Sequence, residues 1–74
     1  MGSITVTLNG TIHNTSANTI GSLLNELGFI PSQVIVELNG EILTKQTLLN
    51  TQLAPNDTVE IIRYIGGGKL KKNS

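Results

Sequence analysis

The chain has 74 residues, no cysteine, one histidine, two aromatic residues and a formal net charge of zero. A chain of this length folds as one domain, because it buries only roughly 60% of its unfolded surface and cannot form a second core. The missing cysteines exclude disulfide scaffolds and cysteine-ligated zinc or iron–sulfur sites, and a single histidine excludes a histidine-rich metal centre.

The first elements predict a β-hairpin. Residues 4–8 alternate apolar side chains with threonines, which is the period of a strand with one solvent-facing side. Asn9-Gly10 follows directly and supplies the positive φ angles of a type I′ turn. We therefore expect a second strand over residues 11–15 that pairs back antiparallel.

A short helix should follow this hairpin. Apolar residues recur at helical spacing over residues 20–27, which predicts about two turns with one apolar stripe. Either Asn18 or Thr19 can cap its start. Gly28 stands where a left-handed residue ends a helix.

The second half of the chain predicts another hairpin and a long final strand. Residues 34–38 alternate and lead into the Asn39-Gly40 turn, after which residues 41–43 can return as a short strand. Residues 44–55 show no clear period, so we expect a crossing segment with one helical turn. Residues 58–65 form a strongly apolar final strand.

This order of elements predicts an α+β fold of the β-grasp, or ubiquitin-like, type. In this fold a mixed β-sheet of four to five strands packs on one short α-helix. The final strand should lie centrally and parallel to the first, because it is the most apolar strand. We expect a single domain over residues 1–68, followed by a disordered basic extension over residues 69–74 that is either a precursor segment or a cloning-derived tail.

The zero net charge hides an uneven distribution. Lys69, Lys71 and Lys72 lie in the tail, whereas up to Gly68 two basic residues face five acidic ones and leave a formal charge of −3. An acidic body with few aromatic rings predicts no nucleic-acid binding. No secretory signal or membrane span is recognisable, so we expect a soluble cytoplasmic protein, with a plastid as the alternative.

No catalytic constellation stands out. His13 lies on a predicted strand among polar neighbours, so we interpret it as structural or solvent-exposed. The glycines Gly66, Gly67 and Gly68 lack the helix, lysine and hydroxyl of a phosphate loop. Three glycines extend at most about 10 Å without side chains, so they can thread a narrow channel and present a carboxyl group to a partner's active site. A flexible linker is the alternative.

The chain's ending is the most specific motif. The segment Val59-Glu60-Ile61-Ile62-Arg63-Tyr64-Ile65-Gly66-Gly67-Gly68, together with the Val36-Glu37-Leu38-Asn39-Gly40-Glu41 hairpin, resembles the ThiS family of sulfur carrier proteins of thiamine biosynthesis. The similarity spans about residues 4–68. Carriers for molybdopterin usually have prolines shortly before their Gly-Gly, and none occurs between Thr58 and Gly68, which favours the thiamine branch.

The resemblance implies a carrier rather than an enzyme, with no bound cofactor and no metal. An E1-like adenylyltransferase would use ATP to adenylate the carboxylate of Gly68 or Gly67. A persulfide sulfur donor would convert the adenylate to a thiocarboxylate, and thiazole synthase would take the sulfur. A ubiquitin-like modifier, a carrier for another product such as molybdopterin, and a plain interaction domain remain alternatives.

The residues Lys69–Ser74 depart from the family pattern, in which the chain ends at the glycines. While Lys69 is attached, Gly68 carries an amide and cannot be adenylated. Trimming of a precursor, a cloning-derived tail and loss of carrier activity are the three explanations that remain open.

Strand parity predicts a partner-docking face on the side of the sheet away from the helix. The residues that share this face are Ile35, Glu37, Glu60, Ile62 and Tyr64. They would form an apolar patch with acidic rims, although single exposed apolar residues are also normal. Arg63 has core parity yet is charged, so the strand should leave the sheet there, with Arg63 either snorkelling or contacting a partner.

Overall fold

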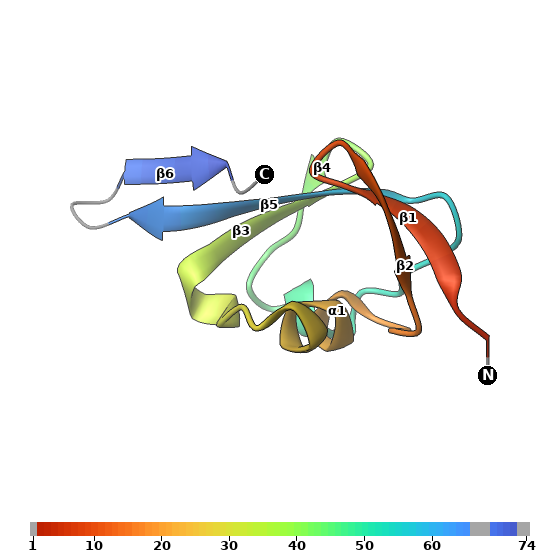
Figure 1. The fold of residues 1–74 in the computed structure, drawn as a ribbon. Coiled ribbons are helices and arrows are strands. Elements are labelled where there is room, and N and C mark those ends of the chain that lie inside the picture. The colour runs from red at the N-terminus through yellow and green to blue at the C-terminus, as the bar shows by residue number, and fades with distance from the viewer. Residues whose placement is uncertain (1, 66–68, 73–74) are drawn as a thin grey trace.

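The computed structural model describes residues 2–65 and 69–72, and it shows a curved sheet packed over one helix (Figure 1). In chain order the elements are β1 (Ile4–Leu8), β2 (Thr11–Thr15), α1 (Ile20–Leu27), the 3-10 helix η1 (Pro31–Gln33), β3 (Val34–Leu38), β4 (Glu41–Ile42), the 3-10 helix η2 (Leu48–Asn50), β5 (Thr58–Ile65) and β6 (Lys69–Lys72).

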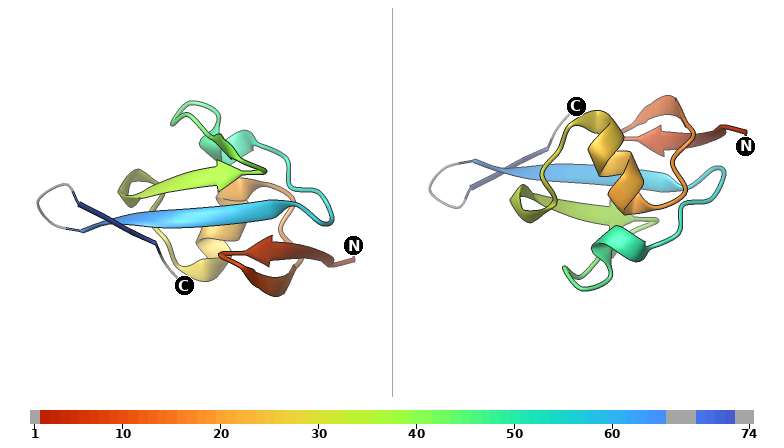
Figure 2. Two further views of the ribbon diagram at one scale, coloured as in Figure 1. Left: turned by 90° about the horizontal axis from the view of Figure 1, so that it is seen from above. Right: turned by 90° about the horizontal axis from the view of Figure 1, so that it is seen from below.

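The strand order confirms the predicted β-grasp arrangement. The main path of the sheet is β2-β1-β5-β3-β4, and β6 pairs with β5 off this path. Strand β5 lies centrally, parallel to β1 and antiparallel to β3, while α1 crosses one face of the sheet (Figure 2). The apolar character of β5 therefore fits its central place.

Both predicted Asn-Gly turns form. Asn9 and Asn39 adopt φ angles of 47° and 53°, and Gly10 and Gly40 follow at 84° and 89°. Two successive positive φ angles are what a two-residue type I′ hairpin requires, so each dipeptide fixes the register of its hairpin.

The helix begins and ends as the sequence predicts. Of the two candidate caps Thr19 is the one used, and its Oγ1 accepts a hydrogen bond from the Ser22 amide at 3.1 Å. Gly28 ends the helix with a φ of 82°. On the same helix, a Cβ at Gly21 would lie 2.7 Å from the carbonyl oxygen of Leu49, so this glycine permits close packing of α1 against η2.

The core lies between the helix and the inner face of the sheet, with two leucines from the crossing segment closing its side. Its buried apolar residues are Val6, Ile20, Leu23, Leu24, Val34, Val36, Leu48, Leu53, Val59 and Ile61. The inward residues of β3 and β5 are those that parity assigns, so the outward residues of both strands face away from the helix.

The structure differs from the sequence-based expectation in two short segments. Strand β4 ends at Ile42 rather than at residue 43, although the Leu43 amide still donates to the Val36 carbonyl at 3.0 Å. The 3-10 turn at Pro31–Gln33 was not predicted; it starts at a proline, whose fixed φ suits the first position of a helical turn.

The third difference concerns the tail, where disorder was expected over residues 69–74. Residues Lys69–Lys72 instead form β6, which pairs antiparallel with the last four residues of β5. The reason is geometric: β1 pairs with β5 only at Thr58 and Val59, which leaves the rest of that edge open to another strand. The expected domain boundary at residue 68 lies outside the described residues.

Candidate functional site

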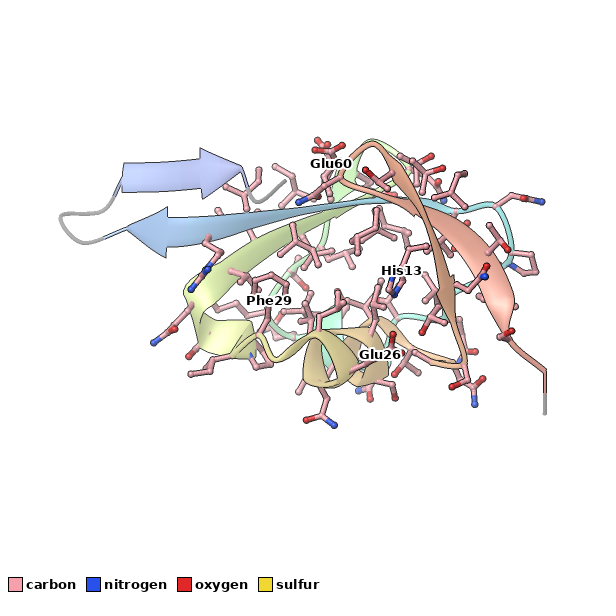
Figure 3. All side chains as sticks on the ribbon, in the orientation of Figure 1. His13, Glu26, Phe29 and Glu60 are labelled. Carbon is pink, nitrogen blue, oxygen red and sulfur yellow. The ribbon has the colours of Figure 1, made fainter. Side chains whose placement is uncertain are left out.

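The open face of the sheet brings four of the five predicted docking residues together. In the β3–β5 register Ile35 lies opposite Ile62, and Glu37 lies opposite Glu60. All four are half-buried, and Figure 3 shows Glu60 on the side of the sheet away from α1. Tyr64 lies two residues further along β5, and its side chain is outside the described residues.

The chemistry of this open face is apolar and acidic. Glu37 and Glu60 lie directly opposite each other, and like charges in such a pair disfavour strand pairing. Ile42 lies opposite Glu37 on β4 and is 64% exposed, which adds a further apolar group to the same row. The open face can therefore bind a partner surface that places a cation among apolar groups.

The expected departure of the strand from the sheet at Arg63 is wrong, because Arg63 lies opposite Val34 in the β3–β5 register and β5 continues to Ile65. The charge is accommodated by the side chain alone. The Arg63 side chain is exposed, and its guanidinium carbon lies 5.7 Å from the centroid of the Phe29 ring, which is a cation–π distance. Phe29 follows the helix and packs against the core from one end. Of the two interpretations offered for Arg63, the structure shows the snorkelling one, and a partner contact stays a prediction.

Two asparagine side chains form hydrogen bonds to the backbone of β5, one on each side of the strand. On the β1 side, Asn9 Oδ1 accepts from the Ile61 amide at 2.7 Å and Asn9 Nδ2 donates to the Ile61 carbonyl at 3.3 Å. On the β3 side, Asn39 Oδ1 accepts from the Thr58 amide at 2.8 Å, and Asn39 Nδ2 donates to Asp57 Oδ1 at 3.0 Å. These roles were missed, because the sequence reveals the turns and not the distant strand that their side chains reach.

A polar cluster joins the edge strand β2 to the helix. Glu26 accepts a hydrogen bond from the Thr15 hydroxyl, and its other oxygen lies 3.1 Å from Nε2 of His13. The Thr15 hydrogen bond holds the pKa of Glu26 below its usual value, the neighbouring His13 adds to this, and burial opposes both. His13 therefore has the structural role expected of it.

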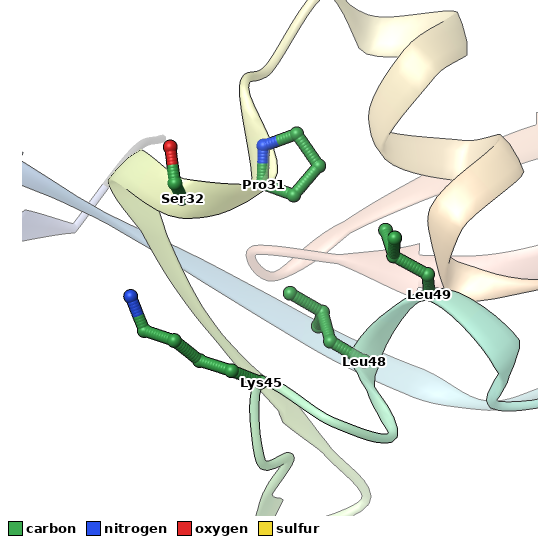
Figure 4. A pocket seen from close by; sticks show the side chains of 5 residues that line it. All are labelled: Pro31, Ser32, Lys45, Leu48 and Leu49. Carbon is green, nitrogen blue, oxygen red and sulfur yellow. The ribbon is translucent and has the colours of Figure 1, made fainter.

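A small pocket opens between η1 and η2 on the helix side of the molecule. Its volume is about 190 Å³, and its walls are Pro31, Ser32, Lys45, Leu48 and Leu49. Figure 4 shows Ser32 and Lys45 on one side of the pocket and Leu49 on the other. None of the described residues that line the pocket has a carboxylate or imidazole, so they offer no general base to activate the hydroxyl or the ammonium group.

The described part of the chain holds few other functional groups. Over residues 2–65 and 69–72, no three metal-binding side chains gather into a possible metal site. Within the same residues no helix has the length and apolarity that a membrane crossing needs. The glycines Gly66, Gly67 and Gly68, which carry the predicted carrier chemistry, lie outside the described residues, directly after Ile65 at the end of β5.

Known proteins resemble this chain in both sequence and fold. Residues 5–68 match the sequence model of the ThiS family. The chain belongs to the ThiS family. A solved structure of a thiamine biosynthesis protein (ThiS) from Geobacter metallireducens superposes with a TM-score of 0.75 at 30% identity, and the match covers 88% of this chain and 100% of that one. The ubiquitin-like β-grasp fold of this ThiS-family chain is thereby confirmed.

Curated relatives of this ThiS-family chain are of two kinds. Thiazole synthases from Magnetococcus marinus and Paramagnetospirillum magneticum are 40% and 38% identical over 63 and 68 residues, or 84% and 90% of this chain. The chain spans only 19% and 21% of their lengths. An uncharacterized protein, ycf40 of Porphyra purpurea, is 33% identical over 66 residues, which cover 88% of this chain and 93% of that protein.

Proposed function

We propose that this ThiS-family chain is a sulfur carrier in thiamine biosynthesis, which other enzymes act on and which performs no catalysis itself. The observation that carries the proposal is the extent of the family match, which runs from residue 5 to Gly68, the last of three glycines. The chemistry is therefore assigned to the glycine end and the positioning to the folded body.

The first steps activate the terminal carboxyl group. Water would hydrolyse the peptide bond between Gly68 and Lys69 and free the Gly68 carboxylate, or the cut would fall after Gly67. An E1-like adenylyltransferase would then join this carboxylate to the AMP moiety of ATP and release pyrophosphate. ATP is thus a substrate of the partner, and the carrier itself binds no cofactor.

The next steps load and deliver sulfur. A persulfide would displace AMP from the acyl adenylate, and a thiol would cleave the resulting S–S bond to leave a thiocarboxylate on the glycine. Thiazole synthase would accept this sulfur during thiazole formation. The body contributes placement, since holding the reacting carbon at a partner's site replaces a bimolecular encounter by a fixed geometry.

Partner docking is assigned to the open face. Ile35 and Ile62 offer apolar area, and the opposed carboxylates of Glu37 and Glu60 suit a basic group on the adenylyltransferase. Thiazole synthase is proposed as a second partner because two relatives of that name contain a region that matches this chain. We expect these steps in the cytoplasm, with a plastid as the alternative.

Intact-mass spectrometry tests the carrier chemistry. The chain ending at Gly68 is incubated with its adenylyltransferase, ATP and a persulfide donor, and we expect the mass gain that replacement of one oxygen by sulfur gives. The full chain is the matched control and should gain nothing, because its Gly68 is an amide. No gain in the shortened chain, with an enzyme that is active on another carrier, would refute the proposal.

Experiments in cell extract, with thiazole synthase and on glycine variants separate the alternatives. Conjugates of higher mass that contain this chain would indicate a ubiquitin-like modifier. A thiocarboxylate that forms but that thiazole synthase does not consume would indicate a carrier for another product, such as molybdopterin. Replacement of Gly67 and Gly68 by alanine without any functional loss would indicate a plain interaction domain.

A further inference from the structure

The two halves of β5 differ in how fully they are paired on the β1 side. There β1 pairs with Thr58 and Val59, and the Asn9 side chain then bonds both backbone groups of Ile61. On the other side the β3 register continues to Arg63. Beyond Ile61 the β1–β2 hairpin pairs with no further described residue of β5. The later half of β5 therefore has an open edge on this side, which we call the β5 edge (residues 62–65).

Alternation along the strand shows which backbone groups form the β5 edge. On the β3 side, Asn39 exchanges hydrogen bonds with Thr58, which has an even residue number. On the β1 side, Asn9 hydrogen-bonds to Val59 and Ile61, which have odd residue numbers. Because successive backbone groups of a strand point to opposite sides, the amides and carbonyls of Arg63 and Ile65 point to the β5 edge.

The chain's own tail occupies this edge. Strand β6 pairs antiparallel over four residues, from Ile62 opposite Lys72 to Ile65 opposite Lys69. Since β3 already pairs with Ile62 on one side, β6 lies on the other side, along the β5 edge. Among the described strands β6 pairs only with β5, and Figure 1 shows it running beside the end of β5, away from α1. Displacement of this four-residue edge strand breaks one short ladder of hydrogen bonds only.

We infer that the β5 edge is a strand-addition site for an extended segment of the thiazole synthase, and that β6 occupies this site while the tail is attached. The inference rests on the proposed carrier function. An added strand recognises the backbone of its neighbour, so affinity comes from main-chain hydrogen bonds. The tail itself shows what the edge accepts, namely a short extended segment with three lysines and one leucine beside an acidic body.

The position of the edge gives this pairing a consequence for sulfur delivery. Its last residue, Ile65, directly precedes the three glycines. A partner strand bound there holds the root of the glycine tail in line with β5 and aims the thiocarboxylate into the partner. A partner bound to the open face alone would fix the position of the sheet. It would not fix the direction of the chain beyond Ile65.

Hydrogen exchange read at single amides tests the inference. In the full chain the amides of Arg63 and Ile65 should be protected, and in the chain ending at Gly68 they should exchange freely. Added thiazole synthase should restore their protection. The Ile62 amide, which faces β3, is the internal control and should stay protected in every sample.

A pair of proline variants tests the competition in the full chain. Lys71→Pro removes the amide of the residue opposite Arg63 and should release β6, whereas Lys72→Pro changes an amide on the outer side of β6 and should not. Both lose the same charge. We expect Lys71→Pro to bind thiazole synthase about tenfold more tightly than Lys72→Pro, since the pairing that must open is worth of the order of one net hydrogen bond.

Two results would overturn the inference. One is equal affinity of the two proline variants for the synthase. The other is a synthase complex in which the amides of Arg63 and Ile65 exchange freely, whether or not the adenylyltransferase protects them. Thiocarboxylate formation together with either result would remove the strand-addition site and leave the carrier function standing. Absence of both the thiocarboxylate and synthase binding would remove both.

Discussion

The side chain of Asn9 should contribute more to the free energy of unfolding than its place in a turn suggests. Asn9→Gly keeps the turn, because glycine adopts the φ of 47° without strain, but it removes both hydrogen bonds to Ile61. The amide bond, at 2.7 Å, is a good one, whereas the carbonyl bond, at 3.3 Å, is longer than usual and contributes less.

The expected loss follows from these two bonds. A net hydrogen bond contributes about 0.5–1.5 kcal/mol, and a partly buried amide left without a partner costs about 1–3 kcal/mol. We therefore expect Asn9→Gly to lower the free energy of unfolding by about 2 kcal/mol. For a domain of this size that loss corresponds to a fall in melting temperature of roughly 8–16 °C. Asn9→Asp keeps the acceptor and should lose less than Asn9→Gly.

A matched control separates the hydrogen bonds from the backbone effect. Asn56 also has a positive φ, of 71°, yet its side chain makes no hydrogen bond to the described residues. Asn56→Gly should therefore change stability by less than about 0.5 kcal/mol. Urea unfolding followed by circular dichroism measures all three variants. Equal losses for Asn9→Gly and Asn56→Gly would refute the reasoning, because the loss would then come from glycine in the unfolded chain.

Three further variants test other contacts. Gly21→Ala should cost about 1 kcal/mol in urea unfolding, because overlap with the Leu49 carbonyl outweighs the gain in helix propensity, and a net stabilisation would contradict this. The lowered pKa of Glu26 means that its carboxylate stabilises the fold above the usual value of 4.5 and loses this effect as the pH falls through the lowered pKa. The stability difference between wild type and Glu26→Gln should therefore shrink on acidification, and a constant difference would be evidence against it. Glu37→Gln should raise the free energy of unfolding by a few tenths of a kcal/mol, since it removes repulsion from Glu60. The same variant should bind the adenylyltransferase more weakly in calorimetry. Unchanged binding would argue against the open face as the docking site.

Local signals explain why most of the fold was predictable. The two Asn-Gly dipeptides set both hairpins, and parity identified the residues of β3 and β5 that are buried in the core. The sequence offers two favourable caps, Asn18 and Thr19, and the structure uses Thr19. The choice depends on where the strand before them ends, which the cap preference of either residue does not reveal.

Long-range contacts explain what was not predictable. Asn9 reaches a residue 52 positions away, and His13 meets Glu26 because β2 happens to pass the end of the helix. Strand β6 depends on where β1 stops pairing with β5, which no local pattern of the tail reveals. Four of the five predicted docking residues lie together on the open face, as Ile35 opposite Ile62 and Glu37 opposite Glu60, whereas their use by a partner stays a prediction.

The two halves of β5 carry different tasks. Residues 58–61 are held by β1, by β3 and by both asparagine side chains, and two of their side chains are buried in the core. Residues 62–65 are paired by β3 only as far as Arg63, and otherwise by the displaceable β6. Substitutions in the first half should therefore act on folding, whereas those in the second half should act on partners. A carrier needs this division, because the end of β5 must change neighbours while the body that positions it stays folded.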